Sequence, residues 1–194
     1  MQMTETRQFS VSPNIIYSLI KAQAGSLGKA ITECVMNSVD AFAKRVDIKV
    51  TSTNIIIKDD GIGFQTREEI EAWFETLGFD HSMEGNHRAF GAFGIGRAQL
   101  WSFAPTIGRT NQFTMDVDIK NKGLDYKLHE TITGETTPGL TIEGTFYKPL
   151  SPAELITLEQ DLRRQIRYVQ VPVRLNGALL GVSPGAQDWD FETD

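Results

Sequence analysis

Hydrophobic residues in the first part of the chain recur with the period of a helix. Between Asn14 and Ala24 they fall at spacings of three and four, which predicts a helix, and Pro13 is suited to its first turn. Ser26 can cap a second helix that runs to about Lys44 and buries one apolar stripe. We therefore expect two helices that follow each other closely.

Strand-like runs follow these helices. Residues 46–51 alternate apolar and charged positions, and residues 54–58 contain three consecutive isoleucines, as in a strand buried on both faces. Thr66 and Glu69 have the spacing of a capping box for a helix that ends near residue 77. Residues 78–90 show no periodicity, and a loop of this length in a compact domain is usually functional.

The remainder of the chain is mostly β in pattern. The expected elements are a short helix over 97–103, strands over 106–110, 113–120, 124–133 and 140–148, a helix over 152–167 and a strand over 168–175. Segregated helices and strands favour an α+β fold. We expect a two-layer sandwich in which helices cover one face of a mixed, mostly antiparallel sheet.

Length and composition narrow the class of protein. The chain has 194 residues, 40% hydrophobic and 23% charged, as expected for one sizeable globular domain. A net charge of −6 argues against a broad nucleic-acid footprint, so we expect no direct nucleic-acid contact. The single cysteine excludes an intramolecular disulfide, and the three histidines lack metal-ligand spacing.

The sequence has no long apolar window and no apolar signal core. We therefore expect a cytoplasmic protein with no membrane partner.

One face of the second predicted helix carries three polar side chains. Glu33, Asn37 and Asp40 are separated by four and three residues, which places them about one turn apart. They could form a solvated helix face or line a cavity. In a cavity, an asparagine oxygen could bind Mg²⁺ beside nucleotide phosphates, and a carboxylate one turn away could activate a water molecule.

Two glycine-containing turns are further candidates. Asp59-Asp60-Gly61-Ile62-Gly63 follows the isoleucine strand; it could be an ordinary turn, or Asp59 could accept hydrogen bonds from a ligand that the glycines allow to approach. Gly91, Gly94 and Gly96 precede a predicted helix, whose N-terminus would favour phosphate. Their spacing matches neither the dinucleotide fingerprint nor a P-loop.

Together and in this order, the three motifs resemble those of the GHKL superfamily of ATPases. This superfamily includes gyrase B subunits, ninety-kilodalton heat-shock chaperones, MutL, MORC proteins and histidine kinases. The matching stretches are residues 33–41 (ECVMNSVDA), 59–63 (DDGIG) and 91–96 (GAFGIG), with Gly144-Thr145 as a fourth element. The resemblance spans about residues 12–175 and looks closest to the chaperone, MutL and MORC branches. It implies the Bergerat fold, with ATP bound between helices and a lid.

The resemblance also implies a role for each matching residue. Glu33 would be the general base for ATP hydrolysis, Asn37 the Mg²⁺ ligand, and Asp59 the acceptor for the adenine amino group. Thr145 would help to hold the adenine. The other residues expected beside the nucleotide are Asp40, Ala41, Gly61, Gly63, Phe64, Gly91, Phe93, Gly94, Ile95 and Gly96.

The resemblance implies an organisation for the chain as well. Residues 1–180 would form the ATP-binding domain, with the lid at about 78–96, and residues 181–194 a linker or cut end. Members of the superfamily usually complete the active site with a Lys or Arg from a following domain, so we expect such a domain or a transient homodimer, and weak hydrolysis in isolation. Two alternatives remain: a histidine-kinase-type catalytic domain and a nucleotide-binding scaffold that does not hydrolyse ATP.

Overall fold

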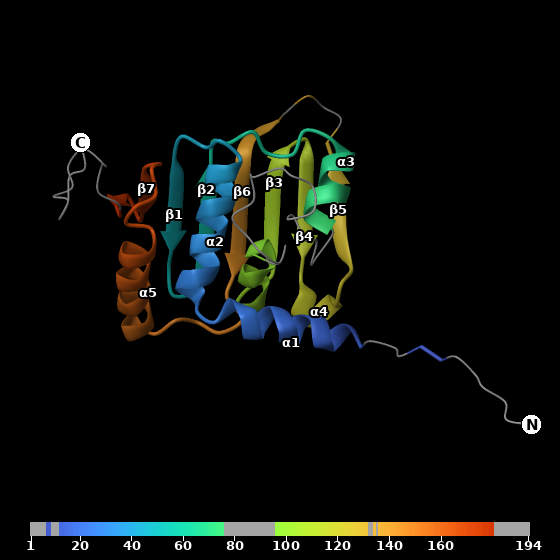
Figure 1. The fold of residues 1–194 in the computed structure, drawn as a ribbon, viewed down its shortest axis with the longest axis horizontal. Coiled ribbons are helices and arrows are strands. Elements are labelled where there is room, and N and C mark those ends of the chain that lie inside the picture. Colours follow the sequence, from blue (N-terminus) through green and yellow to red (C-terminus); the bar gives the residue numbers. More distant parts are fainter. Residues whose placement is uncertain (1–6, 9–11, 76–95, 132–133, 135, 181–194) are drawn as a thin grey trace, which may run out of the picture.

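The computed structural model describes residues 7–8, 12–75, 96–131, 134 and 136–180, and within them one mixed sheet is the central layer (Figure 1). Its strand order is β5-β4-β3-β6-β2-β1-β7-β8. Among the described strands only β1 and β7 pair in parallel, and the other neighbours are antiparallel. The strands are β1 (Val46–Val50), β2 (Asn54–Asp59), β3 (Thr106–Asn111), β4 (Phe113–Val117), β5 (Tyr126–Glu130), β6 (Thr137–Thr145), β7 (Val173–Leu175) and β8 (Ala178–Leu179).

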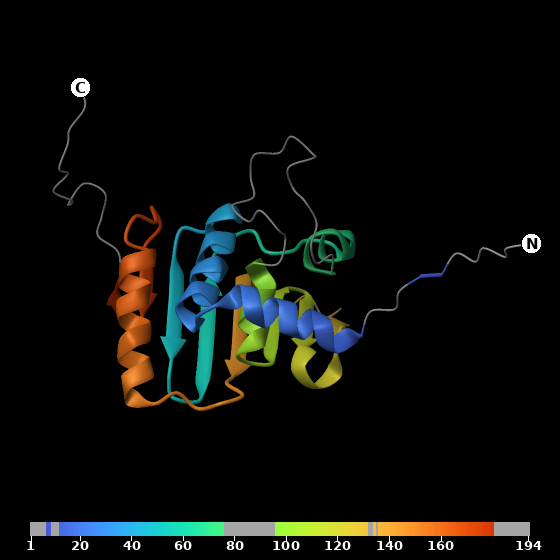
Figure 2. The ribbon, with the colours of Figure 1, turned by 60° about the horizontal axis from the view of Figure 1, so that its bottom comes forward.

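Helices pack on one face of this sheet (Figures 1 and 2). They are α1 (Pro13–Ala24), α2 (Leu27–Asp40), α3 (Arg67–Ile70), α4 (Ile119–Lys122) and α5 (Pro152–Gln165), with a π-helical turn η1 (Glu71–Glu75) and a 3₁₀ helix η3 (Gly96–Ser102). On the other face the strands carry partly or fully exposed side chains, among them Lys49, Lys58, Arg109 and Lys127. This α+β sandwich confirms the predicted fold class.

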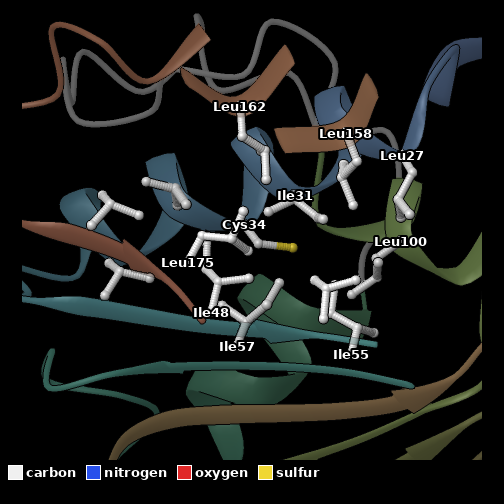
Figure 3. Close-up of a cluster of buried hydrophobic side chains, with 14 of the residues drawn as sticks. Leu27, Ile31, Cys34, Ile48, Ile55, Ile57, Leu100, Leu158, Leu162 and Leu175 are labelled. Atoms are coloured by element: carbon white, nitrogen blue, oxygen red, sulfur yellow. The ribbon is translucent and has the colours of Figure 1, made fainter. Parts of the chain in front are cut away.

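The main hydrophobic core lies between α2, α5 and the centre of the sheet (Figure 3). Ile31 and Cys34 of α2 meet Leu162 of α5 above Ile48 of β1 and Ile57 of β2. Residue 28 is a glycine, and a Cβ there would lie 3.1 Å from the Cβ of Asp161, so α2 and α5 approach closely. The packing therefore holds α2 directly over β1 and β2.

A second cluster joins α1, η3 and the β4–β5 part of the sheet. It contains the buried residues Ile20, Trp101, Phe113 and Met115. The ring of Phe74 makes edge-on contacts with Phe64, Trp101 and Tyr126, at centroid distances of 6.2, 5.6 and 5.4 Å. Such edge-on aromatic contacts are favourable beyond simple burial. They fix η1 against the sheet.

Helix α2 begins where predicted but ends earlier than expected. The side chain of Ser26 accepts a hydrogen bond from the Lys29 N–H and so caps the helix. The helix stops at Asp40 rather than near Lys44. Phe42 has a positive φ of 60°, and the Ala41 carbonyl accepts a hydrogen bond from the Ile62 N–H, so the chain turns away toward the glycine turn after β2.

Strand predictions were wrong at several boundaries. The strand expected over 113–120 ends at Val117, because Asp118 caps the short α4 by accepting from the Asn121 N–H. The strand expected over 168–175 is confined to 173–175, β6 begins at 137 rather than 140, and β8 was not predicted. Strand β2 is not buried on both faces; Ile56 lies on the open face, beside Lys49, and is only partly covered.

Within the residues that the structure describes, every helix is too short or too polar to span a bilayer.

Removal of core volume under α5 should destabilise the protein. Leu162 is fully buried, so Leu162→Ala should lower the free energy of unfolding by about 2 to 5 kcal/mol. Ile156 lies on the same helix but is 60% exposed, so Ile156→Ala should change it by less than about 1 kcal/mol. Urea denaturation of both variants measures the difference, and equal losses would contradict the assigned core.

Candidate functional site

A cavity of about 420 Å³ opens between the C-terminal half of α2, the end of β2 and η1. Its rim carries the exposed hydrophobic side chains of Phe42, Ile62 and Trp73. Its interior is apolar and is lined by buried residues of α2, η3 and the sheet, namely Cys34, Ile57, Leu100, Trp101, Met115 and Val117. The volume and the apolar lining suit a small-molecule ligand with a flat apolar body.

Asp59 is the buried acidic group of this cavity. It ends β2 and is only 5% exposed. Its Oδ1 accepts hydrogen bonds from the N–H groups of Gly61 (2.9 Å) and Leu140 (3.1 Å), and its Oδ2 lies 2.9 Å from the Ser38 hydroxyl. A carboxylate has about four acceptor positions, so one position on Oδ2 is left for a donor from a ligand.

The glycines around Asp59 allow backbone segments to approach closely. Gly63 has a φ of +61°, and a Cβ there would lie 2.1 Å from Thr110 Oγ1. At Gly139, with a φ of +69°, a Cβ would lie 2.2 Å from the Asp59 carbonyl oxygen. Only glycine fits these positions, so the turn after β2 and the start of β6 close around the carboxylate.

The polar face of α2 reaches the cavity. Asn37 and Asp40 line it, together with Ala41. Glu33 lies one turn earlier, outside the lining residues and half-buried. A Cβ on Gly96 would lie 2.7 Å from Glu33 Oε2, so the start of η3 contacts this carboxylate. The structure therefore brings the helix motif, the turn after β2 and the last glycine of the third motif to one region.

Thr145 is not brought to this region. It pairs with Asn54 at the opposite end of β2 from Asp59, and its hydroxyl donates to Asn54 Oδ1 at 3.0 Å. The place beside Asp59 belongs instead to Gly139-Leu140 of the same strand, since the Leu140 N–H donates to the carboxylate. The prediction for Thr145 came from the Gly-Thr residue pair in the sequence. The register of β6 against β2 instead places the other end of β6 beside Asp59.

Three more of the predicted residues lie close to Asp59 in the chain. Gly61, Gly63 and Phe64 lie at the predicted turn, and Phe64 is fixed there because its N–H donates to the Thr110 hydroxyl at 3.0 Å. Gly91, Phe93, Gly94 and Ile95 lie outside the described residues.

Sequence reasoning gave no functional role to Ser38, Thr110 or Leu140. For Ser38, the signal was its place on the same side of α2 as Cys34, one turn away.

Burial also affects the protonation of the single cysteine, Cys34. The pKa of Cys34 is raised to about 12 by desolvation and, further, by the neighbouring carboxylates of Glu33 and Asp59. The thiol is therefore protonated at neutral pH and is a poor nucleophile. Cys34 acts here as part of the apolar wall.

Among the described residues, side chains alone do not form a metal centre. In the described part of the chain, no three His, Cys, Asp or Glu residues gather where they could hold a metal ion. The arrangement at Asn37 and Glu33 still fits a Mg²⁺ ion of the kind held mainly by phosphates and water, since such an ion needs one or two protein oxygens.

Comparison with known protein families agrees with this geometry. Residues 25–131 match the family described as histidine kinase-, DNA gyrase B-, and HSP90-like ATPase, more than half of the chain. A search of the curated proteins finds no match for this chain. The family description covers several branches, so the closer likeness to the chaperone, MutL and MORC branches stays a prediction. Family membership supports ATP binding in general. The chain belongs to the histidine kinase-, DNA gyrase B-, and HSP90-like ATPases.

Proposed function

We propose that this chain binds Mg²⁺-ATP in the cavity beside Asp59 and hydrolyses the nucleotide slowly. The observation that carries the proposal is the buried Asp59 carboxylate, which keeps one acceptor position in a mostly apolar cavity. An ionised group is costly to bury unless it is well hydrogen-bonded. The N–H groups of Gly61 and Leu140 reduce this cost, together with the Ser38 hydroxyl, whose one proton is shared between Asp59 Oδ2 and the Cys34 carbonyl.

The open acceptor position favours adenine over other purines. The adenine amino group is a donor and can fill it, whereas guanine and hypoxanthine present a carbonyl acceptor at the same ring position. Placing an acceptor against the buried carboxylate leaves two acceptors facing each other, which is unfavourable in an apolar surrounding. The apolar side chains of Phe64, Leu140 and Ile142 line the same cavity and suit the purine ring.

The triphosphate would then extend along the polar face of α2. Asn37 would supply one oxygen to a magnesium ion, which neutralises phosphate charge when bound. Glu33, one turn away, would accept a proton from the attacking water. The contact of Glu33 with Gly96 supports this assignment, since it places the carboxylate beside the end of the glycine motif. Asp40 and Ala41 line the cavity and would lie between the adenine and the phosphates.

The proposal extends to the organisation of the chain. Residues 1–180 would be the nucleotide-binding domain, residues 78–96 its lid and residues 181–194 a linker. A Lys or Arg from a further domain or from a second copy would complete the site, and nucleotide state would control closure of the lid and assembly.

Two alternative functions are a histidine-kinase-type domain and a scaffold that does not hydrolyse ATP. Both keep the same adenine-binding residues but predict no Glu33-dependent release of phosphate.

Asp59→Asn should weaken ATP binding. The change removes the charge that the adenine amino group would meet, so the dissociation constant should rise at least about tenfold in calorimetry. Asp60→Asn is the matched control, because Asp60 is exposed and bonds only the Lys44 and Arg45 N–H groups among the described residues. Undiminished binding by a folded Asp59→Asn variant would contradict the proposed base site.

Glu33→Ala should separate binding from hydrolysis. Loss of a general base typically slows a reaction by about 10² to 10⁴, while the contacts to adenine remain. Steady-state phosphate release and calorimetry on the same variant measure both quantities. Glu143→Ala, on the open face of the sheet, should change neither. Hydrolysis that survives Glu33→Ala would show that another group acts as base.

A further inference from the structure

A second cavity, of about 600 Å³, lies at the other end of the sheet. It is bounded by the end of α1, the start of α2, the end of η3, α4, the segment after β6 and the start of α5. Helix α2 runs from this cavity to the first, a distance of about 20 Å over its 14 residues. All residues that line the second cavity lie in the described part of the chain.

Its walls combine aromatic rings with ammonium groups. Tyr17, Phe103 and Tyr147 supply rings, and Lys21, Lys120 and Lys148 supply positive charge. Two carboxylates also line the cavity, but each has another partner. Glu154 accepts from the Ser151 N–H and hydroxyl and pairs with Lys148 at 3.7 Å, and Asp161 pairs with Arg164 at 3.2 Å.

Among the described residues, Lys21 and Lys120 are therefore the charged groups of this cavity that have no ion-pair partner. Within the described residues, neither ammonium group lies within ion-pair distance of a carboxylate. The Lys120 Nζ sits over the ring of Tyr147 at 4.4 Å from its centroid, a cation–π contact. A charged group beside an aromatic wall and without a counterion is placed to meet an anion.

The aromatic wall is held in position by hydrogen bonds. The Tyr147 hydroxyl donates to Asp118 Oδ1 at 2.7 Å, and the same oxygen caps α4, the helix that carries Lys120. Asp118 thus fixes both the ring and the lysine above it. The Tyr17 hydroxyl is also held, because it donates to the Ser102 carbonyl at 3.3 Å. Binding elements that are fixed before a ligand arrives lose less entropy on binding.

The start of α2 adds a further attraction for an anion. The N–H groups of Leu27 and Gly28 belong to the first turn, which has no acceptors within the helix. Both residues line the cavity, next to Gly25 and Ser26. The positive end of the helix dipole and the two lysines therefore act on the same space.

We propose that this cavity is a second ligand site, for a small molecule that joins one anionic group, carboxylate or phosphate, to an aromatic body. Lys21, Lys120 and the first turn of α2 bind the anion, and Tyr17, Phe103 and Tyr147 contact the ring. The site is separate from the ATP site, and its existence does not depend on the function proposed above.

Phenyl phosphate is the probe for this site. Titration into the isotopically labelled chain should give saturable shifts of the amide resonances of Gly25, Gly28 and Lys120, with a dissociation constant of about 1 mM or tighter. Inorganic phosphate and phenol, each carrying half of the chemistry, should both bind at least about tenfold more weakly. Equal binding of either one would overturn the proposed ligand class.

Lysine variants test where phenyl phosphate binds. Lys21→Gln with Lys120→Gln should weaken phenyl phosphate at least about tenfold, whereas Lys49→Gln with Lys58→Gln, on the open face of the sheet, should leave it unchanged. Asp59→Asn should also leave it unchanged, so failure at the ATP site and failure here are distinguishable. Absence of binding, loss of binding in the Asp59→Asn variant, or full affinity in the Lys21/Lys120 variant would overturn the proposal.

Discussion

The burial of the Asp59 carboxylate is the interaction on which the arrangement around the first cavity depends. A carboxylate that is 5% exposed requires hydrogen-bond donors, and these come from α2, from the turn after β2 and from the start of β6. Each donor fixes one element: Ser38 the helix, Gly61 the turn and Leu140 the strand. The close approach at Gly63 and Gly139 follows from the same requirement, because a Cβ would push these segments apart.

Much of this arrangement was predictable from the sequence. The helix caps at Ser26 and Thr66, the hydrophobic periodicity and the isoleucine strand are local signals, and they gave the element order and the α+β class. The spacing of Glu33, Asn37 and Asp40 is also local, since a helix fixes which residues share a face. These predictions depended on short-range geometry alone.

The predictions that were wrong depended on long-range register. Whether Thr145 or Leu140 faces Asp59 is decided by the pairing of β6 with β2, and nothing in the residues near 145 encodes that pairing. The donors Ser38 and Leu140 were missed for the same reason, because they are 21 and 81 residues away from Asp59. The end of α2 was set by a tertiary hydrogen bond from Ile62, which no helix propensity reports.

The central claim is that the Asp59 carboxylate accepts a hydrogen bond from the amino group of the purine ring. A comparison of ATP with inosine triphosphate tests this claim most directly. The two nucleotides share the ribose and the triphosphate and differ in the group that would face the carboxylate. Calorimetric titration of the unaltered chain, in the presence of Mg²⁺, should show ATP bound at least about tenfold more tightly than inosine triphosphate. Equal affinities would contradict the account, because the buried carboxylate would then make no contact that distinguishes an amino group from a carbonyl.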